Sequence, residues 1–277
     1  MRKIIYTVAI AFLAVSCYKS DIYNTPNPTE GTTKVTVEWS LLHDGDSAPT
    51  TYTILQGGVE QQMNSTTNTF ILEPTNDEEF VVYNSPSGVV IKDGVASLGE
   101  MTRTAVDPEI MPENLYYGVG KIDFIEDYIS TDKITTKRGT APLTIKLSYD
   151  QSEAKNIGSV KVELSGIASE RNLRSDALSS GVTLTQYPTI DTENSEITLQ
   201  YNILGTTSDF QELKITLTTT DNQQRVVVSD ISSQFLGFNS AMNPLTLSGN
   251  MNLPADLEIE GSISDWMDVV VGDGEAI

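Results

Sequence analysis

The chain has 277 residues, with 17 Lys and Arg against 38 Asp and Glu, and its formal net charge is −21. This acidity excludes nucleic acid as a natural partner, because phosphate binding needs clustered cations, and it also disfavours anionic membrane surfaces. The single cysteine excludes disulfide bonds within the chain, so stability must come from apolar burial in a large core.

The first seventeen residues are typical of a lipoprotein signal peptide. Arg2 and Lys3 precede an apolar run over 4–15, which is too short to span a bilayer because a span needs roughly 20 residues. We expect a signal peptide over 1–16, cleavage after Ser16, and lipid such as palmitate on Cys17. One departure is Ala14, three places before the cysteine, where Leu is more usual. The alternatives are a plain secretion signal or a buried first strand with an incidental thiol.

Lipid on Cys17 would fix where the protein works. Two or three acyl chains, at roughly 0.8 kcal/mol per buried CH₂, hold a protein durably on a membrane. Cys17 is followed by Tyr18 rather than by an aspartate that would retain the protein at the inner membrane. We therefore expect a lipid-anchored protein of the cell outer membrane, exposed at its surface, with residues 17–32 as a polar tether.

The residues available for catalysis are few. His43 is the only histidine, which excludes a zinc site with two histidines and, with Cys17 committed to lipid, a cysteine–histidine pair. Residues 44–46 lack the further oxygen ligands of a calcium loop. We interpret His43 as a solvated residue of a polar turn, and we expect no enzyme activity, no catalytic residues, no cofactor and no metal site.

Strand patterns begin after the tether and continue to the end of the chain. Residues 34–39 alternate between apolar and polar side chains, as a half-buried strand does. Residues 92–94 predict a hairpin turn. In the first half we predict strands over 34–39, 51–55, 70–72, 79–83, 89–91, 95–98 and 117–125, with a long loop over 99–116.

The second half repeats the same organisation. Residues 221–224 predict a hairpin, and 168–180 suit a short helix or a loop. The predicted strands are 143–147, 160–164, 182–184, 196–201, 213–217, 225–228, 245–247, 257–259 and 263–271. Many short strands with few helical periods predict an all-β fold of two tandem antiparallel β-sandwich domains. We place the N-terminal domain at 33–137 and the C-terminal domain at 138–277.

The order of several short motifs resembles the FimB-like fimbrial anchor family of Bacteroidales, which are lipoproteins related to fimbrillins. The matching pieces are Cys17 and residues 35–40, 51–54, 80–84 with Gly88, 143–147, 162–168, 243–250 and 263–266. The resemblance implies two transthyretin-like sandwich domains and a place at the base of a pilus. It also implies that fimbrillin-type stalk subunits are partners, joined by β-strand complementation.

The arginine distribution favours an anchor over a stalk subunit within this resemblance. Stalk subunits resemble proteins whose first strand is removed by an arginine-specific protease. No arginine lies between Cys17 and Glu100, and the first after the signal is Arg103. Such a protease could not release the first strand, so the lipid link would survive. The alternative is chance, because the chain has only six arginines.

The C-terminal stretch is the candidate donor strand. An apolar-alternating strand can complete the open sheet of a neighbour. The candidate donor residues are Ile263, Trp266, Met267, Val269 and Val271. The alternative is the ordinary last strand of the second domain, and we expect Trp266 and Trp39 to be core residues.

A shorter motif suggests a modification. Asp46-Ser47-Ala48 resembles a three-residue O-glycosylation signal of exported proteins in these bacteria. We predict that Ser47 lies in an exposed turn.

Two other functions stay open. A surface glycan-binding lipoprotein would need an aromatic platform, for which Tyr116, Tyr117 and Tyr128 are the candidates. A pilus tip adhesin of the same superfamily is the other alternative.

Overall fold

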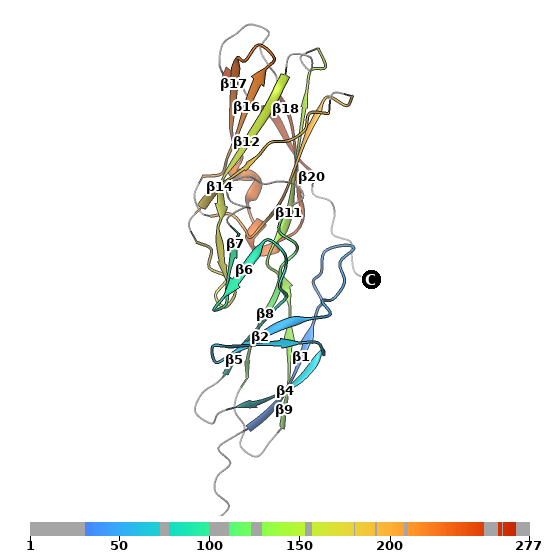
Figure 1. The fold of residues 1–277 in the computed structure, drawn as a ribbon, viewed down its shortest axis with the longest axis vertical. Helices are drawn as coiled ribbons and strands as arrows, with labels where there is room; N and C mark the ends of the chain where they lie inside the picture. The colour runs from blue at the N-terminus through green and yellow to red at the C-terminus, as the bar shows by residue number, and fades with distance from the viewer. Residues whose placement is uncertain are drawn as a thin grey trace, which may run out of the picture.

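The fold is described from a computed structural model of the chain. It describes residues 31–72, 78–99, 111–122, 129–152, 157–179, 181–191, 193–207, 210–251, 260–261 and 263–269. These residues form an elongated molecule built almost wholly of strands, with the early strands gathered at one end and the late strands at the other (Figure 1).

The described residues contain twenty strands. The first ten are β1 (Gly31–Glu38), β2 (Tyr52–Gln56), β3 (Val59–Met63), β4 (Thr67–Leu72), β5 (Glu78–Tyr83), β6 (Val89–Lys92), β7 (Val95–Leu98), β8 (Tyr116–Ile122), β9 (Ile129–Thr135) and β10 (Lys137–Arg138). The next ten are β11 (Ala141–Tyr149), β12 (Ile157–Ala168), β13 (Glu170–Asn172), β14 (Gly181–Gln186), β15 (Glu196–Ile203), β16 (Glu212–Thr219), β17 (Gln224–Asp230), β18 (Leu245–Met251), β19 (Glu260–Gly261) and β20 (Ile263–Val269). A 3₁₀ turn, η4 (Ser232–Phe235), and a one-turn helix, α3 (Phe238–Ala241), precede β18.

The N-terminal half consists of three layers. Sheet A has the order β4-β1-β9, sheet B has β10-β8-β5-β2-β3, and sheet C has β13-β7-β6. Sheet B is the middle layer because its successive residues are buried on opposite faces. Phe80 and Val82 pack with residues of sheet A such as Val35, whereas Val81 and Tyr83 belong to the larger core that also contains Ala96 of sheet C. This explains why the run 80–83 is apolar throughout rather than alternating.

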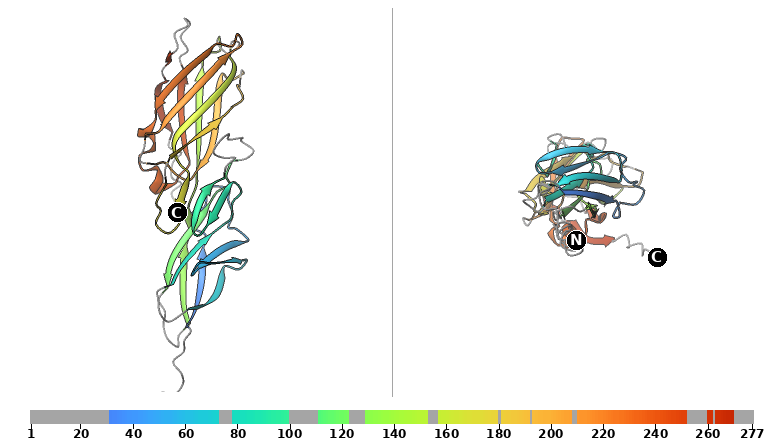
Figure 2. Two further views of the ribbon diagram at one scale, coloured as in Figure 1. Left: turned by 60° about the vertical axis from the view of Figure 1, so that its left-hand side comes forward. Right: turned by 90° about the horizontal axis from the view of Figure 1, so that it is seen from below.

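The C-terminal half is a sandwich of two sheets. Sheet D has the order β15-β11-β18-β20 and sheet E has β14-β12-β16-β17-β19. The strictly alternating strand β11 buries Leu143, Ile145 and Leu147 against residues of sheet E such as Val162 and Ile215. Figure 2 shows these long strands running along the molecule away from the N-terminal half.

The expected all-β fold class is confirmed, and most neighbouring strands are antiparallel. Three pairs are parallel: β1 with β9, β11 with β18, and β17 with β19. A parallel neighbour needs a long connection, so strands distant in sequence lie side by side. The strands β3, β9, β10, β13 and β19 were not expected from the sequence.

Both predicted hairpins are present, β6–β7 around Asp93 and Gly94, and β16–β17. The stretch 168–180 contains no helix among its described residues; it completes β12, forms β13 and then turns. The strand predicted over 257–259 lies outside the described residues.

Sheet C joins the two halves. Its strand β13 comes from the second half of the chain and pairs with β7 of the first half, with Arg171 opposite Ala96. The larger core also contains residues of both halves, including Tyr117 and Leu204. The division at 137 and 138 stays a prediction, but the halves share a sheet and a core.

Candidate functional site

The predicted lipid attachment site lies at the beginning of the chain. Ser16, Cys17 and residues 18–30 of the predicted tether fall outside the described residues, so cleavage and lipidation stay predictions, whereas residues 31 and 32 already belong to β1. Within the described part of the chain, no helix is long and apolar enough to cross a membrane.

The strand that follows the tether is held from both sides. β1 pairs antiparallel with β4 and parallel with β9. Thr33 donates a hydrogen bond to the carboxylate of Asp132 across the β1–β9 pair (2.9 Å), and Lys133 forms an ion pair with Glu38 (2.6 Å). A force applied through the residues before β1 would therefore act on the central strand of sheet A. Removal of β1 would leave β4 and β9 without a strand between them.

The candidate donor strand is docked in this structure. β20 contains Ile263, Trp266, Met267 and Val269 and pairs antiparallel with β18 at one end of sheet D. Val271 lies outside the described residues. Among the described strands, β20 is thus the last one in the order of sheet D, and its role as a donor stays a prediction.

The register of this edge pair is irregular. Asp268 is opposite Leu247, whose side chain is buried, and Met267 is opposite Ser248, whose side chain is half-buried. The register shifts between Ser248 and Asn250. A shift of this pairing by one residue would change which residues of β20 stand opposite the buried positions of β18.

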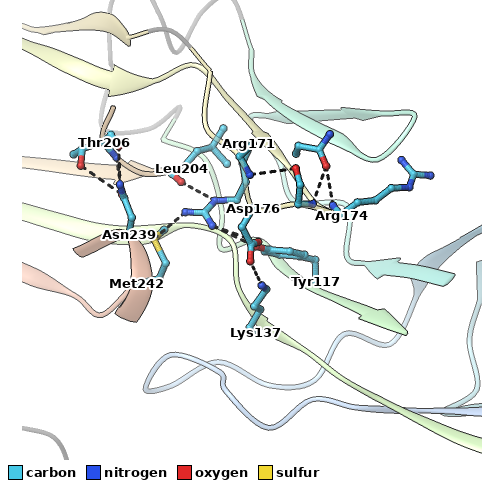
Figure 3. A network of polar contacts seen from close by, with 12 residues as sticks. Tyr117, Lys137, Arg171, Arg174, Asp176, Leu204, Thr206, Asn239 and Met242 are labelled. Atoms are coloured by element: carbon cyan, nitrogen blue, oxygen red, sulfur yellow. Dashed lines mark hydrogen bonds and ion pairs between the residues drawn. The ribbon is translucent and has the colours of Figure 1, made fainter. Parts of the chain in front are cut away.

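A polar network ties the two halves together beside sheet C (Figure 3). Arg171, only 3% exposed, donates hydrogen bonds to the carbonyl oxygen of Leu204 (2.9 Å), the hydroxyl of Tyr117 (3.3 Å) and the sulfur of Met242 (3.2 Å). Its guanidinium lies 3.8 Å from the carboxylate of Asp176. These partners satisfy a buried charge that would otherwise be costly.

Asp176 collects the other cationic and polar groups of this network. Its carboxylate accepts hydrogen bonds from Tyr117 and Lys137, and the Lys137 ammonium lies 5.0 Å from the centre of the Tyr117 ring. Burial alone would raise the pKa of Asp176, but the hydrogen bonds from Lys137 and Tyr117 and the charge of Arg171 together lower it. Burial raises the pKa of the Tyr117 hydroxyl.

Arg138 makes a second connection across the junction. It donates hydrogen bonds to the carbonyl oxygens of Leu41 (3.2 Å) and Leu42 (3.0 Å) and to the amide oxygen of Asn243 (2.5 Å). The loop after β1 is thereby joined to the segment before β18. Neither Arg138 nor Arg171 was singled out from the sequence, because their partners are distant along the chain.

His43 was expected in solvent, and this prediction is wrong. The side chain is only 5% exposed, and its Nε2 lies 3.1 Å from the carbonyl oxygen of Thr140. Burial lowers the pKa of this imidazole. The turn folds back onto the junction because the His43 backbone N–H donates to the Tyr116 hydroxyl (3.0 Å). The histidine is a packing residue.

The prediction of an aromatic platform is also wrong for Tyr116 and Tyr117, the two candidates that the structure describes. Tyr116 and Tyr117 are 3% and 0% exposed, because β8 lies in the middle layer and both of its faces are covered. The Tyr116 hydroxyl donates to the carboxylate of Asp46. Tyr128 lies outside the described residues.

The remaining predicted residues divide by exposure. Trp39 is half-buried and packs edge-on against Tyr52, with ring centres 5.5 Å apart, as expected of a core-facing residue. The side chain of Trp266 is not described.

Ser47 is exposed in a segment without regular secondary structure, where a modifying enzyme could reach it. No group of three or more metal-ligating side chains occurs in the described ranges.

Comparison with solved structures shows which proteins share this fold. A candidate adhesin from Bacteroides ovatus aligns over 88% of this chain and 96% of its own, with a TM-score of 0.57 and 15% identity. The fimbrial anchor protein Mfa2 from Porphyromonas gingivalis aligns over 87% and 97%, with a TM-score of 0.56 and 10% identity. A candidate polysaccharide-binding protein from Bacteroides thetaiotaomicron aligns over 84% and 96%, with a TM-score of 0.53 and 10% identity.

The sequence comparisons give the family. A search of curated proteins finds no match. The model of the fimbrillin-A associated anchor proteins Mfa1 and Mfa2 matches residues 94–271, which is well over half of the chain and includes β7 and β13 of sheet C, the junction network and both sheets of the C-terminal sandwich. The chain therefore belongs to the family of fimbrillin-A associated anchor proteins.

Proposed function

We propose that this protein is an outer-membrane lipoprotein that anchors a fimbrium and joins its stalk subunits by β-strand complementation. Cys17 carries the lipid after cleavage behind Ser16, and residues 17–32 connect it to β1. The family supports a fimbrial role and association with fimbrial subunits. The protein acts by holding another protein rather than by catalysis.

The observation that carries strand complementation is the edge position of β20. In sheet D, β20 has β18 as its hydrogen-bonded neighbour on one side and ends the order of described strands on the other. An edge strand offers a row of unpaired backbone groups, and main-chain hydrogen bonds give affinity to an added strand.

Retention of β1 supports an anchor rather than a stalk subunit. The chain has no arginine between Cys17 and Glu100, so an arginine-specific protease leaves β1 joined to the lipid. The central place of β1 between β4 and β9 then transmits force from the membrane into the sheet.

Co-purification of pilin subunits from the native cells tests the proposal. A variant with both Met267→Asp and Val269→Asp should lose the recovered pilin, because charge on the apolar row opposes strand pairing. The matched control is Asp268→Asn in the same strand, which should keep it. Thermal unfolding of each purified variant shows whether the domain itself remains folded. Full pilin recovery with the double variant would refute the donor role of β20.

Lipidation needs a separate test because the anchor role depends on it. Labelled fatty acid should enter the wild-type protein and not Cys17→Ser, and the variant should leave the outer membrane fraction. An unchanged location for Cys17→Ser would contradict the lipid anchor.

A pilus tip adhesin differs from an anchor in position. Immunogold labelling of whole cells should place an anchor at the cell surface beneath the fibre, whereas label at the distal fibre ends would support the adhesin. The aromatic platform that favoured a glycan-binding lipoprotein is missing at Tyr116 and Tyr117, which are buried.

A further inference from the structure

A polar groove lies where the two halves meet, beside the loop that contains Asp46. Its volume is about 690 Å³, and its walls come from that loop, from residues 111–116 and from β11 and β15. Cavities of roughly 300–1,000 Å³ are typical of sites for small ligands. The groove draws residues from distant segments, so only the folded molecule forms it.

The chemistry of the walls selects the kind of ligand. The lining includes the carboxylates of Asp46 and Glu113 and the side-chain amides of Asn114, Gln200 and Asn202, with no Lys, Arg or His among its residues. An anionic ligand would meet two carboxylates without a compensating cation, which is unfavourable away from bulk water. The apolar part consists of three prolines, one methionine and the rings of Tyr116 and Tyr201, which is too little for a lipid chain.

The amide groups are held in fixed orientations. Asn202 donates from Nδ2 to the carbonyl oxygen of Pro112 (2.9 Å) and to Oδ1 of Asn114 (2.8 Å). Asn114 in turn donates from its Nδ2 to the Asp46 carboxylate (2.8 Å). Because both partners of the Asn202 nitrogen are acceptors, the orientation of its amide is settled by the network.

These hydrogen bonds occupy the amide nitrogen of Asn202 and leave its amide oxygen as an acceptor. Oδ1 of Asn202 is buried and has no hydrogen-bond partner among the described residues. This atom is enclosed, so a ligand in the groove does not contact it; the acceptors open to a ligand are the side chains of the exposed residues Asp46, Glu113 and Gln200. The groove is therefore rich in acceptors and already ordered, and the matching ligand supplies hydroxyl donors without negative charge.

We propose that this groove binds a neutral carbohydrate. Sugar hydroxyls donate to Asp46, Glu113 and Gln200, and the C–H faces of the sugar ring pack on Pro49 and Pro112. This mode needs no exposed aromatic platform. It is independent of strand complementation, because the groove is built from β11, β15 and loops rather than from β20.

Calorimetric titration of the mature chain with neutral trisaccharides, namely maltotriose, laminaritriose, xylotriose and mannotriose, tests the proposal. At least one should bind saturably in the micromolar to millimolar range. Asn202→Leu should weaken it about tenfold, because it removes the hydrogen bond that positions Asn114 and, through Asn114, Asp46. Gln200→Ala, at an exposed position, should weaken it without risk to folding, and Gln61→Leu on β3 of the other half should leave it unchanged.

Several results would overturn the carbohydrate site. They are the absence of saturable binding to all four sugars, equal affinity in Asn202→Leu and Gln200→Ala, and equal or tighter binding of trigalacturonate, which is anionic. Loss of binding on addition of EDTA would show a cation site instead and would also refute it. Pilin co-purification should be unaffected by Gln200→Ala, so failure of this site and failure of the anchor role are distinguishable.

Discussion

The guanidinium of Arg171 donates a hydrogen bond to the hydroxyl of Tyr117 across the junction of the two halves, 3.3 Å away and 54 residues apart in sequence. Tyr117 lies in the middle layer of the N-terminal half, and Arg171 lies in the one strand of the second half that joins sheet C. A substitution that breaks this hydrogen bond therefore tests whether the two halves stabilise each other.

Arg171→Met should destabilise the protein by about 3 kcal/mol, because it removes a buried charge and leaves the Leu204 carbonyl oxygen and Asp176 short of partners. Urea unfolding measures the change. Lys214→Met is the control, since Lys214 pairs with Glu163 at the surface (3.4 Å) and should cost under about 1 kcal/mol. Equal losses in the two variants would show that the junction network does not couple the halves.

Acid should weaken the junction through Asp176. Its folded pKa lies below the ordinary value of 3.8, so its contribution to stability is fully present above that unfolded value and is lost as the pH falls through the folded pKa. Urea midpoints from about pH 6 to about pH 3 should fall less steeply for Asp176→Asn than for the wild type. Parallel curves for the two proteins would contradict this assignment.

Gly166 should tolerate no side chain. Its φ is +73°, and an added Cβ would lie 2.7 Å from the carbonyl oxygen of Phe210. Gly237 is a matched control, because its φ is +78° and nothing lies within 4 Å of an added Cβ. Gly166→Ala should cost about 1–3 kcal/mol more than Gly237→Ala in chemical unfolding. A difference near zero would mean that the backbone at the β12 bulge moves freely.

We also propose that Ser47 is O-glycosylated in the native cells. Intact-mass measurement of the protein purified from them should show a heterogeneous excess mass that disappears in Ser47→Ala. Ser152→Ala, at another exposed serine, should keep it. A mass equal to that of the lipidated polypeptide alone would exclude the modification.

Local patterns predicted much of the fold. The alternation in β11 is sufficient to predict a strand, and the turn residues between β6 and β7 are sufficient to predict a hairpin. Both features are short-range, because they depend on one buried face and on one tight turn. β9 escaped prediction because the four residues between Ile129 and Ile134 are polar and show no apolar alternation, although Ile134 is buried in the core. Its partner β1 lies almost a hundred residues earlier and is parallel to it.

The site residues likewise fall into those that the linear sequence reveals and those that depend on the folded structure. Cys17 and the long arginine-free stretch after it are features of the linear chain, so the sequence alone determined the expected lipid anchor and the fimbrial resemblance. The burial of His43, Tyr116 and Tyr117, the charge of Arg171 inside the junction and the groove beside Asp46 were decided by the tertiary structure. Alternation along a strand shows that one face is covered, whereas what covers it depends on strands that only folding brings together.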